Sequence, residues 1–220
     1  MYKSKVLLRN FLYEFLEQVR TVAQNVWNED LEYNEDTRNN DWIILKLDTP
    51  LDFNDDVQPA CLPSPNWSPD TDSYSRCFVS GWGSLEFEEN SSDALQWIEV
   101  PALTNEVCKQ SYGNESISDD IICAGYVEGG NNSWPGNSGG PFVCLNNESS
   151  AILTGIASFG HEFASPGHYG IYAPMTQILD WIQSNLVCVC NVSQSKSYEH
   201  LLLMFFLILG INKWKDYNHC

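Results

Sequence analysis

The feature that most constrains this chain is a glycine-rich run near its middle, Trp134–Pro141, with the letters WPGNSGGP. Glycines around Ser138 allow a tight turn that exposes a serine hydroxyl. Such a turn also directs the backbone N–H groups of Gly136 and Ser138 toward one small space, where they can hold an oxyanion. Because glycine- and serine-rich turns are common, the run alone is also compatible with an ordinary loop.

Length and composition indicate a folded, acidic chain. Its 220 residues are long enough to bury a substantial core, and 43% of them are hydrophobic, which excludes a disordered protein. The 29 acidic residues against 11 Lys and Arg give a net charge of -18. Such a surface repels phosphate backbones and anionic lipid, so the sequence disfavours nucleic acid and membranes as partners.

The cysteines indicate disulfides rather than a metal site, because their spacing lacks the two close pairs of a zinc site. There are eight: Cys61, Cys77, Cys108, Cys123, Cys144, Cys188, Cys190 and Cys220. Candidate glycan sites of the type Asn-x-Ser lie at Asn66, Asn90, Asn114, Asn131, Asn147 and Asn191. Since disulfides and glycans both form in the secretory pathway, the sequence predicts an extracellular glycoprotein with no metal and no cofactor.

The two ends of the chain differ from its middle. Charged residues interrupt the apolar residues of the segment 1–20, which argues against a signal peptide. Apolar residues recur in this segment at the spacing of an amphipathic helix. The competing prediction is a strand that begins at about Gln18. After a polar linker comes an apolar block of 11 residues, 201–211. A membrane-spanning helix needs about 20 residues, so we expect a tail without a folded role rather than a membrane anchor.

Several short motifs follow one another along the chain. They are a strand-like run from Trp42 to Leu47 directly after Asp41, CFVSGWG from Cys77, a short helix from Asn105 to Tyr112, IICAG from Ile121, GIASFG from Gly155, and an amphipathic stretch from Thr176 to Leu186. With the run around Ser138, they resemble the trypsin-like, or chymotrypsin-type, serine proteases over roughly residues 20–187.

This resemblance implies an all-β, chymotrypsin-like double β-barrel with a complete C-terminal barrel, an incomplete N-terminal barrel and a C-terminal α-helix. The implied organisation is a divergent segment at 1–20, a partial protease domain at 21–187, and a linker with a short hydrophobic tail at 188–220. The implied partners are peptide or protein substrates.

The resemblance also assigns roles in acyl transfer. Ser138 corresponds to the nucleophile and Asp41 to the carboxylate that orients the base, with the N–H groups of Gly136 and Ser138 as the oxyanion hole. A neutral substrate pocket would be lined by Asn132, Ser133, Ser158, Gly160 and Gly170. The implied disulfides are Cys77–Cys144 and Cys108–Cys123. The pairing of Cys61, Cys188, Cys190 and Cys220 stays open, and Cys61 is a candidate for an unpaired thiol.

Three departures from the family pattern argue against catalysis. The family's general base lies upstream of its Asp, whereas all histidines here follow Ser138, at His161, His168, His200 and His219. Asn137 replaces the family's Asp, so it cannot form the ion pair with a newly cut N-terminus. Trp134 and Phe163 replace a cysteine bridge across the pocket. Loss of a triad member leaves only about 10³–10⁴-fold acceleration over water.

The sequence therefore predicts a serine-type endopeptidase homologue that is inactive as this chain. One alternative is a non-catalytic pseudoprotease that binds peptides or a protein partner. Another is a fragment of a longer, multidomain, secreted zymogen, in which an upstream segment supplies the histidine.

Overall fold

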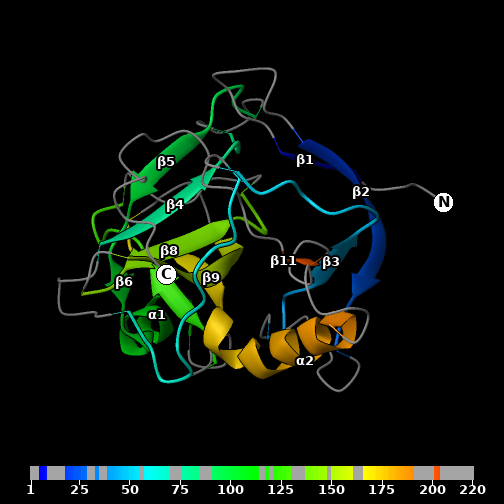
Figure 1. Cartoon of the computed structure of the whole chain (residues 1–220). Coiled ribbons are helices and arrows are strands. Elements are labelled where there is room, and N and C mark those ends of the chain that lie inside the picture. Colours follow the sequence, from blue (N-terminus) through cyan, green and yellow to red (C-terminus); the bar gives the residue numbers. More distant parts are fainter. Residues whose placement is uncertain are drawn as a thin grey trace.

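The computed structural model contains two β-sheets, with helix α2 (Leu179–Cys190) running along both (Figure 1). For residues 5–8, 186–190 and 201–203 the structure describes the backbone only. The described residues are 5–8, 18–28, 33–34, 39–54, 57–69, 76–84, 91–113, 117–118, 121–129, 137–147, 150–160, 166–190 and 201–203. None of the helices in these ranges is both long enough and apolar enough to cross a lipid bilayer.

The C-terminal sheet has seven strands among the described residues, in the order β5-β4-β8-β9-β10-β7-β6, each antiparallel to its neighbour. Their bounds are β4 (Cys77–Gly81), β5 (Gln96–Glu99), β6 (Ala102–Leu103), β7 (Ile122–Ala124), β8 (Pro141–Leu145), β9 (Ala151–Gly160) and β10 (Gly170–Pro174). Helix α1 (Asn105–Tyr112) joins β6 to β7 over the residues predicted for it. The mostly β content confirms the predicted all-β class.

The core of this sheet contains a stacked pair of aromatic rings. Phe142 on β8 stacks on Tyr172 on β10, with ring centroids 4.5 Å apart, and both residues are fully buried. Strands β8 and β10 are buried along almost their whole length, because their sequences PFVCL and GIYAP are continuous apolar runs. This sheet therefore supplies a rigid platform for the loops at its ends.

Disulfides connect the elements of the C-terminal sheet. Cys77 on β4 is joined to Cys144 on β8, and Cys108 on α1 is joined to Cys123 on β7. Cys61 is also disulfide-bonded. The expectation of an unpaired thiol at Cys61 is therefore wrong.

The N-terminal sheet has the order β1-β2-β3-β11, with β1 (Lys5–Leu8), β2 (Gln18–Val26), β3 (Ile44–Leu47) and β11 (Leu201–Leu203). The strand predicted from Gln18 is confirmed. The helix indicated by the spacing of Leu8 and Val19 is not formed at these two residues. Both lie in strands, which pair antiparallel with each other. β2 runs across residue 20.

The C-terminal tail departs from expectation. α2 continues to Cys190, beyond the predicted end of the domain, and the first residues of the apolar block form β11. β11 pairs antiparallel with β3, with Leu202 opposite Leu45. The expectation of a tail without a folded role is therefore wrong for residues 201–203.

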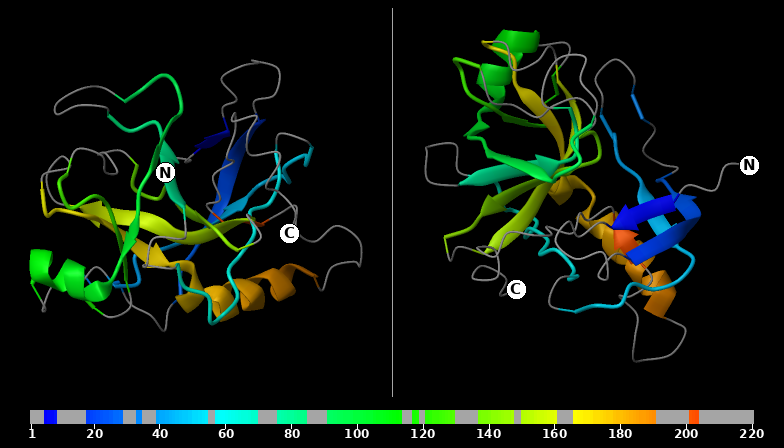
Figure 2. Two further views of the ribbon diagram at one scale, coloured as in Figure 1. Left: turned by 90° about the vertical axis from the view of Figure 1, so that its left-hand side faces the viewer. Right: turned by 90° about the horizontal axis from the view of Figure 1, so that it is seen from above.

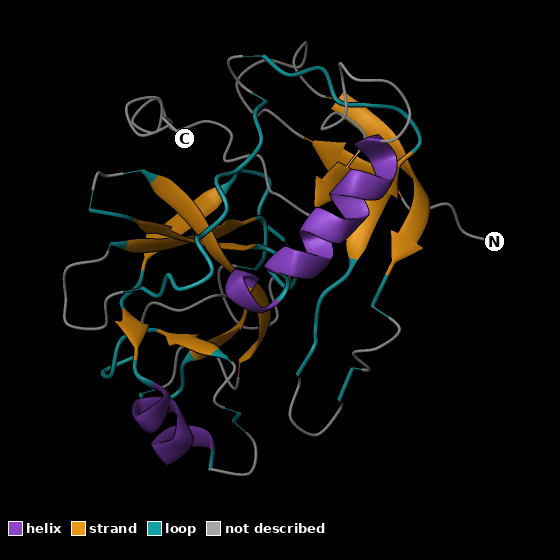
Figure 3. Cartoon of the chain, turned by 60° about the horizontal axis from the view of Figure 1, so that its bottom comes forward, coloured by secondary structure: helices purple, strands orange, loops and turns teal. Residues whose placement is uncertain are grey.

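A second apolar cluster connects the two sheets. Ile44 on β3 packs in one core with Val143 on β8 and with Met175 and Ile182, which lie in the 3₁₀ helix Met175–Gln177 and in α2. Beside this core, the Trp42 and Trp181 rings lie 4.7 Å apart at 52°. Figures 2 and 3 show α2 lying along the N-terminal strands and reaching the C-terminal sheet. This packing brings the start of β3, and Asp41 with it, to the C-terminal sheet.

Candidate active site

The turn before β8 holds Ser138 with its side chain exposed. Gly140 N–H donates to the Asn137 carbonyl over 2.8 Å, which closes the turn. Gly139 N–H donates to the Ala157 carbonyl on β9, also over 2.8 Å, and Gly139 adopts a φ of 80°, a left-handed conformation that favours glycine. The turn is thus fixed to β9 on one side, while Ser138 itself is exposed.

The side chain of Asn137 also fixes this turn. Asn137 is only 9% exposed, and its Oδ1 accepts a hydrogen bond of 2.8 Å from the Gly83 N–H. A Cβ on Gly81 would lie 2.1 Å from that oxygen, so only glycine leaves room for it. A neutral amide therefore ties the serine turn to the residues at and after the end of β4.

Of the two predicted oxyanion donors, one lies in the described part of the chain. Among the described residues, none accepts a hydrogen bond from the Ser138 N–H. Gly136 lies outside the described residues. The oxyanion hole stays a prediction.

Asp41 and Ser158 come together from opposite sheets. The Ser158 hydroxyl on β9 donates to Asp41 Oδ2 over 2.5 Å, between residues 117 positions apart in the sequence. Such a hydrogen bond to a carboxylate is charge-assisted and fixes the direction of the carboxylate. Sequence reasoning placed Ser158 in the substrate pocket and missed this contact, since nothing local in a strand identifies a partner on the other sheet.

The backbone before Asp41 explains its position. Asn40 adopts a φ of 60°, a conformation that Asn tolerates better than most residues, and its carbonyl accepts a hydrogen bond from the Trp42 N–H. The Ser118 hydroxyl donates to Asn39 Oδ1 over 2.7 Å. Asn39, Asn40 and Trp42 also line a hollow beside Ser158 with room for about one water molecule. This tight turn directs Asp41 toward β9.

The predicted pocket is described in part. Gly160 ends β9 and pairs with Gly170, which begins β10, so the two glycines lie opposite each other at one end of the sheet. Asn132 and Ser133, predicted for the pocket base, lie outside the described residues, as do Trp134 and Phe163.

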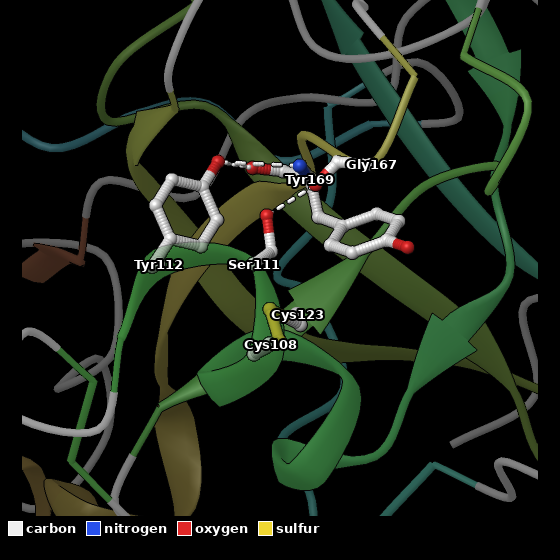
Figure 4. Close-up of a disulfide and its surroundings, with 6 residues drawn as sticks. All are labelled: Cys108, Ser111, Tyr112, Cys123, Gly167 and Tyr169. Atoms are coloured by element: carbon white, nitrogen blue, oxygen red, sulfur yellow. Dashed lines mark hydrogen bonds between the residues drawn. A yellow bond between two sulfur atoms is a disulfide. The ribbon is translucent and has the colours of Figure 1, made fainter.

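Helix α1 fixes the segment that leads into β10 (Figure 4). The Tyr112 hydroxyl accepts a hydrogen bond of 3.2 Å from the Tyr169 N–H and donates one of 2.5 Å to the Tyr169 carbonyl. The Ser111 hydroxyl donates to the Gly167 carbonyl. These bonds hold the residue before Gly170 in place, and sequence reasoning did not single out either side chain.

One histidine lies in the described part of the chain. His168 Nδ1 is 3.3 Å from the Pro166 carbonyl, and its ring stands edge-on to Tyr112 with centroids 6.2 Å apart. These contacts place His168 beside α1. His161, His200 and His219 lie outside the described residues. Across the described ranges, no group of three or more His, Cys, Asp and Glu is arranged to hold a metal ion.

The two sheets, the C-terminal helix and the serine turn define a chymotrypsin-like all-β fold, the class of the trypsin-type serine proteases. Consistent with this, a family model described as Trypsin matches residues 10–182. The chain belongs to the trypsin family of serine proteases. Membership supports a peptidase-type function directed at peptides or proteins, and the disulfides fit an extracellular protein.

Three relatives illustrate the similarity. Trypsin-1 of Astacus astacus is 37% identical over 171 residues, which cover 78% of this chain and 69% of that protein. Venom protease of Bombus pensylvanicus is 38% identical over 160 residues, or 72% of this chain and 64% of that protein. Proclotting enzyme of Tachypleus tridentatus is 36% identical over 149 residues, which cover 67% of this chain and 40% of that protein. The chain thus spans less than two thirds of the length of the last two.

Proposed function

We propose that this 220-residue chain is a serine endopeptidase homologue that presents Ser138 but does not complete acyl transfer. Acyl transfer needs a base that takes the proton from the attacking hydroxyl. The single observation that carries the proposal is the position of the histidines in the sequence. Every histidine of the chain follows Ser138, whereas the family's base precedes its Asp, which corresponds to Asp41 here. The Ser158 hydroxyl donates to one oxygen of Asp41, and a carboxylate with one such bond can still orient an imidazole through its other oxygen.

A hydroxyl cannot replace the missing base. The Ser158 hydroxyl donates its proton to Asp41, and a neutral hydroxyl has no tendency to take a second proton from Ser138. His168 interacts with Pro166 and Tyr112 beside α1 and is not expected to serve either. The remaining acceleration would come from the oxyanion donors and from substrate binding.

A binding function is the second candidate, and the fixed geometry of the serine turn favours it. Asn137 and Ala157 hold this turn through bonds that require neither a triad nor a cut N-terminus. Tyr112 holds the segment before β10 in the same manner. A neutral pocket between these elements would bind peptides with uncharged side chains. In the remaining alternative, an upstream segment of a longer, multidomain protein brings the histidine.

We also propose secretion and glycosylation. Two of the candidate glycan sites, Asn66 and Asn147, lie in described turns and are exposed, as a glycan acceptor must be. The hydrogen bond from the Trp67 N–H to the Ser64 carbonyl closes the first of these turns.

A fluorophosphonate probe, which labels activated serines covalently, tests the proposal. We expect no labelling of Ser138 in the purified 220-residue chain, and the S138A variant sets the background. A set of tetrapeptide p-nitroanilides then separates the two candidates: quenching of tryptophan fluorescence without p-nitroaniline release supports peptide binding. Labelling of the native chain but not of S138A would overturn inactivity.

A further inference from the structure

Ser138 and Asp41 are held by neighbouring residues of one strand, β9. The N–H of Gly139, the residue after Ser138, donates to the Ala157 carbonyl over 2.8 Å. The Ser158 hydroxyl donates to Asp41 Oδ2 over 2.5 Å. The serine turn and the carboxylate, which are far apart in the sequence, are therefore anchored to two consecutive residues of the same strand.

The carboxylate of Asp41 has a second oxygen that can accept hydrogen bonds. Ser158 donates to Oδ2, and among the described residues none donates to Oδ1. An ionised carboxylate offers about four lone-pair sites, and the charge-assisted bond from Ser158 fixes its direction. Ser138 is exposed in its turn. The strand thus holds an oriented acceptor and an exposed serine side by side.

We propose that the base comes with the ligand: the site takes an imidazole from a histidine side chain of a bound peptide. The proposal rests on the proposed function, because a chain with a base of its own has no use for a second imidazole. A neutral histidine ring donates at one nitrogen and accepts at the other. Its Nδ1–H donates to Asp41 Oδ1, and its Nε2 accepts the proton of Ser138. The substrate class is therefore histidine-containing peptides.

The proton passes twice through the imidazole of the peptide. The Ser138 oxygen first bonds to the carbonyl carbon while its proton moves to Nε2, and the imidazolium then protonates the leaving nitrogen as the carbon–nitrogen bond breaks. Water next gives a proton to Nε2 as its oxygen bonds to the same carbon, and the imidazolium returns that proton to the Ser138 oxygen as the ester bond breaks. The histidine must lie on the amino-terminal side of the cleaved bond, because only that part of the peptide stays for the second step.

Two physical effects favour a histidine in the peptide over free imidazole. A group held next to its reaction partner acts at an effective concentration of about 10⁵ M or more, which imidazole in solution does not reach. The bound peptide therefore supplies the base without a further loss of translational freedom. The charge of Asp41, in a chain with a net charge of -18, also stabilises the imidazolium that forms in each step.

Tetrapeptide p-nitroanilides with histidine at each position in turn test the proposal. The matched control peptides carry glutamine at the same position, and the S138A variant sets the background. We expect the purified 220-residue chain to release p-nitroaniline on the order of 10²-fold faster from one histidine peptide than from its glutamine partner.

Methylated histidines in the responding peptide separate proton transfer from simple recognition of a ring. Methylation at Nε2 blocks the atom that takes the proton of Ser138, and we expect release to fall to the glutamine level. Methylation at Nδ1 removes the hydrogen bond to Asp41 and keeps the acceptor at Nε2. We expect this change and Asp41→Asn each to slow release by about tenfold or more. Because both remove the same bond, their effects should not add.

The remaining outcomes distinguish this proposal from the proposed function. If histidine peptides release no more p-nitroaniline than glutamine peptides, or if the Nε2-methylated peptide is cleaved as fast as its parent, the ligand is not the base and this proposal is wrong. Equal release from glutamine peptides in added free imidazole would also overturn it, because the peptide would not be the source. Release from glutamine peptides by the native chain alone, but not by S138A, would instead overturn the proposed function.

Discussion

The two sheets differ in how they bury their strands. In the C-terminal sheet, every residue of β10 is buried and β9 is buried along most of its length. In the N-terminal sheet, β2 has no fully buried residue, and Val19 and Trp27 are 47% and 61% exposed. The C-terminal sheet curls round a core of its own, whereas the described N-terminal strands form an open sheet.

The N-terminal sheet consequently shares its core with the rest of the protein. Ile44 on β3 packs with Val143 on β8 and with Ile182 on α2, so its burial depends on elements from the other half. We infer that the C-terminal sheet carries most of the stability. Three substitutions, at Phe142, Asn137 and Glu99, test this comparison from the largest expected effect to the smallest. Matched variants at Trp27 and Asn146 serve as controls.

Truncation of Phe142 attacks the core that belongs to the C-terminal sheet alone. Its ring is 0% exposed and stacks on Tyr172, so Phe142→Ala removes a large buried surface and leaves a cavity. We expect the free energy of unfolding to fall by about 3–5 kcal/mol. Denaturant unfolding followed by circular dichroism measures this change.

Trp27 is the matched aromatic in the N-terminal half. Since it is 61% exposed, Trp27→Ala is expected to change the free energy of unfolding by less than about 0.5 kcal/mol. Equal losses in the two variants would show that the sheets contribute alike, and the comparison would fail.

Asn137 tests whether the serine turn shares the stability of the C-terminal sheet. Asn137→Ala leaves the Gly83 N–H without its acceptor in a buried position, and we expect a loss of about 1–3 kcal/mol in the free energy of unfolding. Asn146→Ala is the control, because Asn146 Oδ1 accepts an equally short bond, 2.8 Å from the Ser150 N–H, in a half-buried hairpin. A loss at Asn146 as large as at Asn137 would contradict a special role for the buried bond.

Glu99 tests whether the exposure of an interaction, rather than the sheet in which it lies, decides how much it contributes to the free energy of unfolding. The Arg76 guanidinium donates two hydrogen bonds to this carboxylate, at 2.9 and 2.8 Å, and holds the pKa of Glu99 below its usual range. Both side chains are more than a third exposed, so Glu99→Gln is expected to cost less than about 1 kcal/mol at neutral pH.

The sign of the pH dependence at Glu99 follows from the direction of the shift. Because the folded-state pKa is below the unfolded-state pKa, the stabilisation is present above the unfolded-state value and is lost as the pH falls through the folded-state value. Thermal unfolding of wild type and Glu99→Gln between neutral and acid pH should therefore converge in acid. A gap that widens in acid would contradict this assignment.

Much of the fold could be predicted from the sequence, because many of its helices, strands and turns correspond to short sequence motifs. Helix α1 begins and ends where the family resemblance placed it, and β2 starts at the predicted Gln18. The serine turn could be predicted from its glycines, and in the structure residue Ser138 is exposed in a turn. Periodicity and turn chemistry depend on residues close in sequence, so one sequence suffices to find them.

The long-range contacts could not be found in this way. The bond between Ser158 and Asp41 joins residues 117 positions apart, and it exists only because α2 packs the start of β3 against the C-terminal sheet. The pairing of Leu202 with Leu45 was missed for the same reason. An apolar block has the composition of a strand, a buried helix or a lipid-facing segment, and only its neighbours decide among them.

The contact between Trp42 and Trp181 has an optical consequence. Two indole rings at 4.7 Å and 52° couple their electronic transitions, which produces a pair of circular dichroism bands of opposite sign. Trp42 precedes β3 and Trp181 lies on α2, so this pair of bands reports on the packing of α2 against the start of β3. It would disappear when α2 separates from β3, even while each sheet keeps its own ladder of hydrogen bonds.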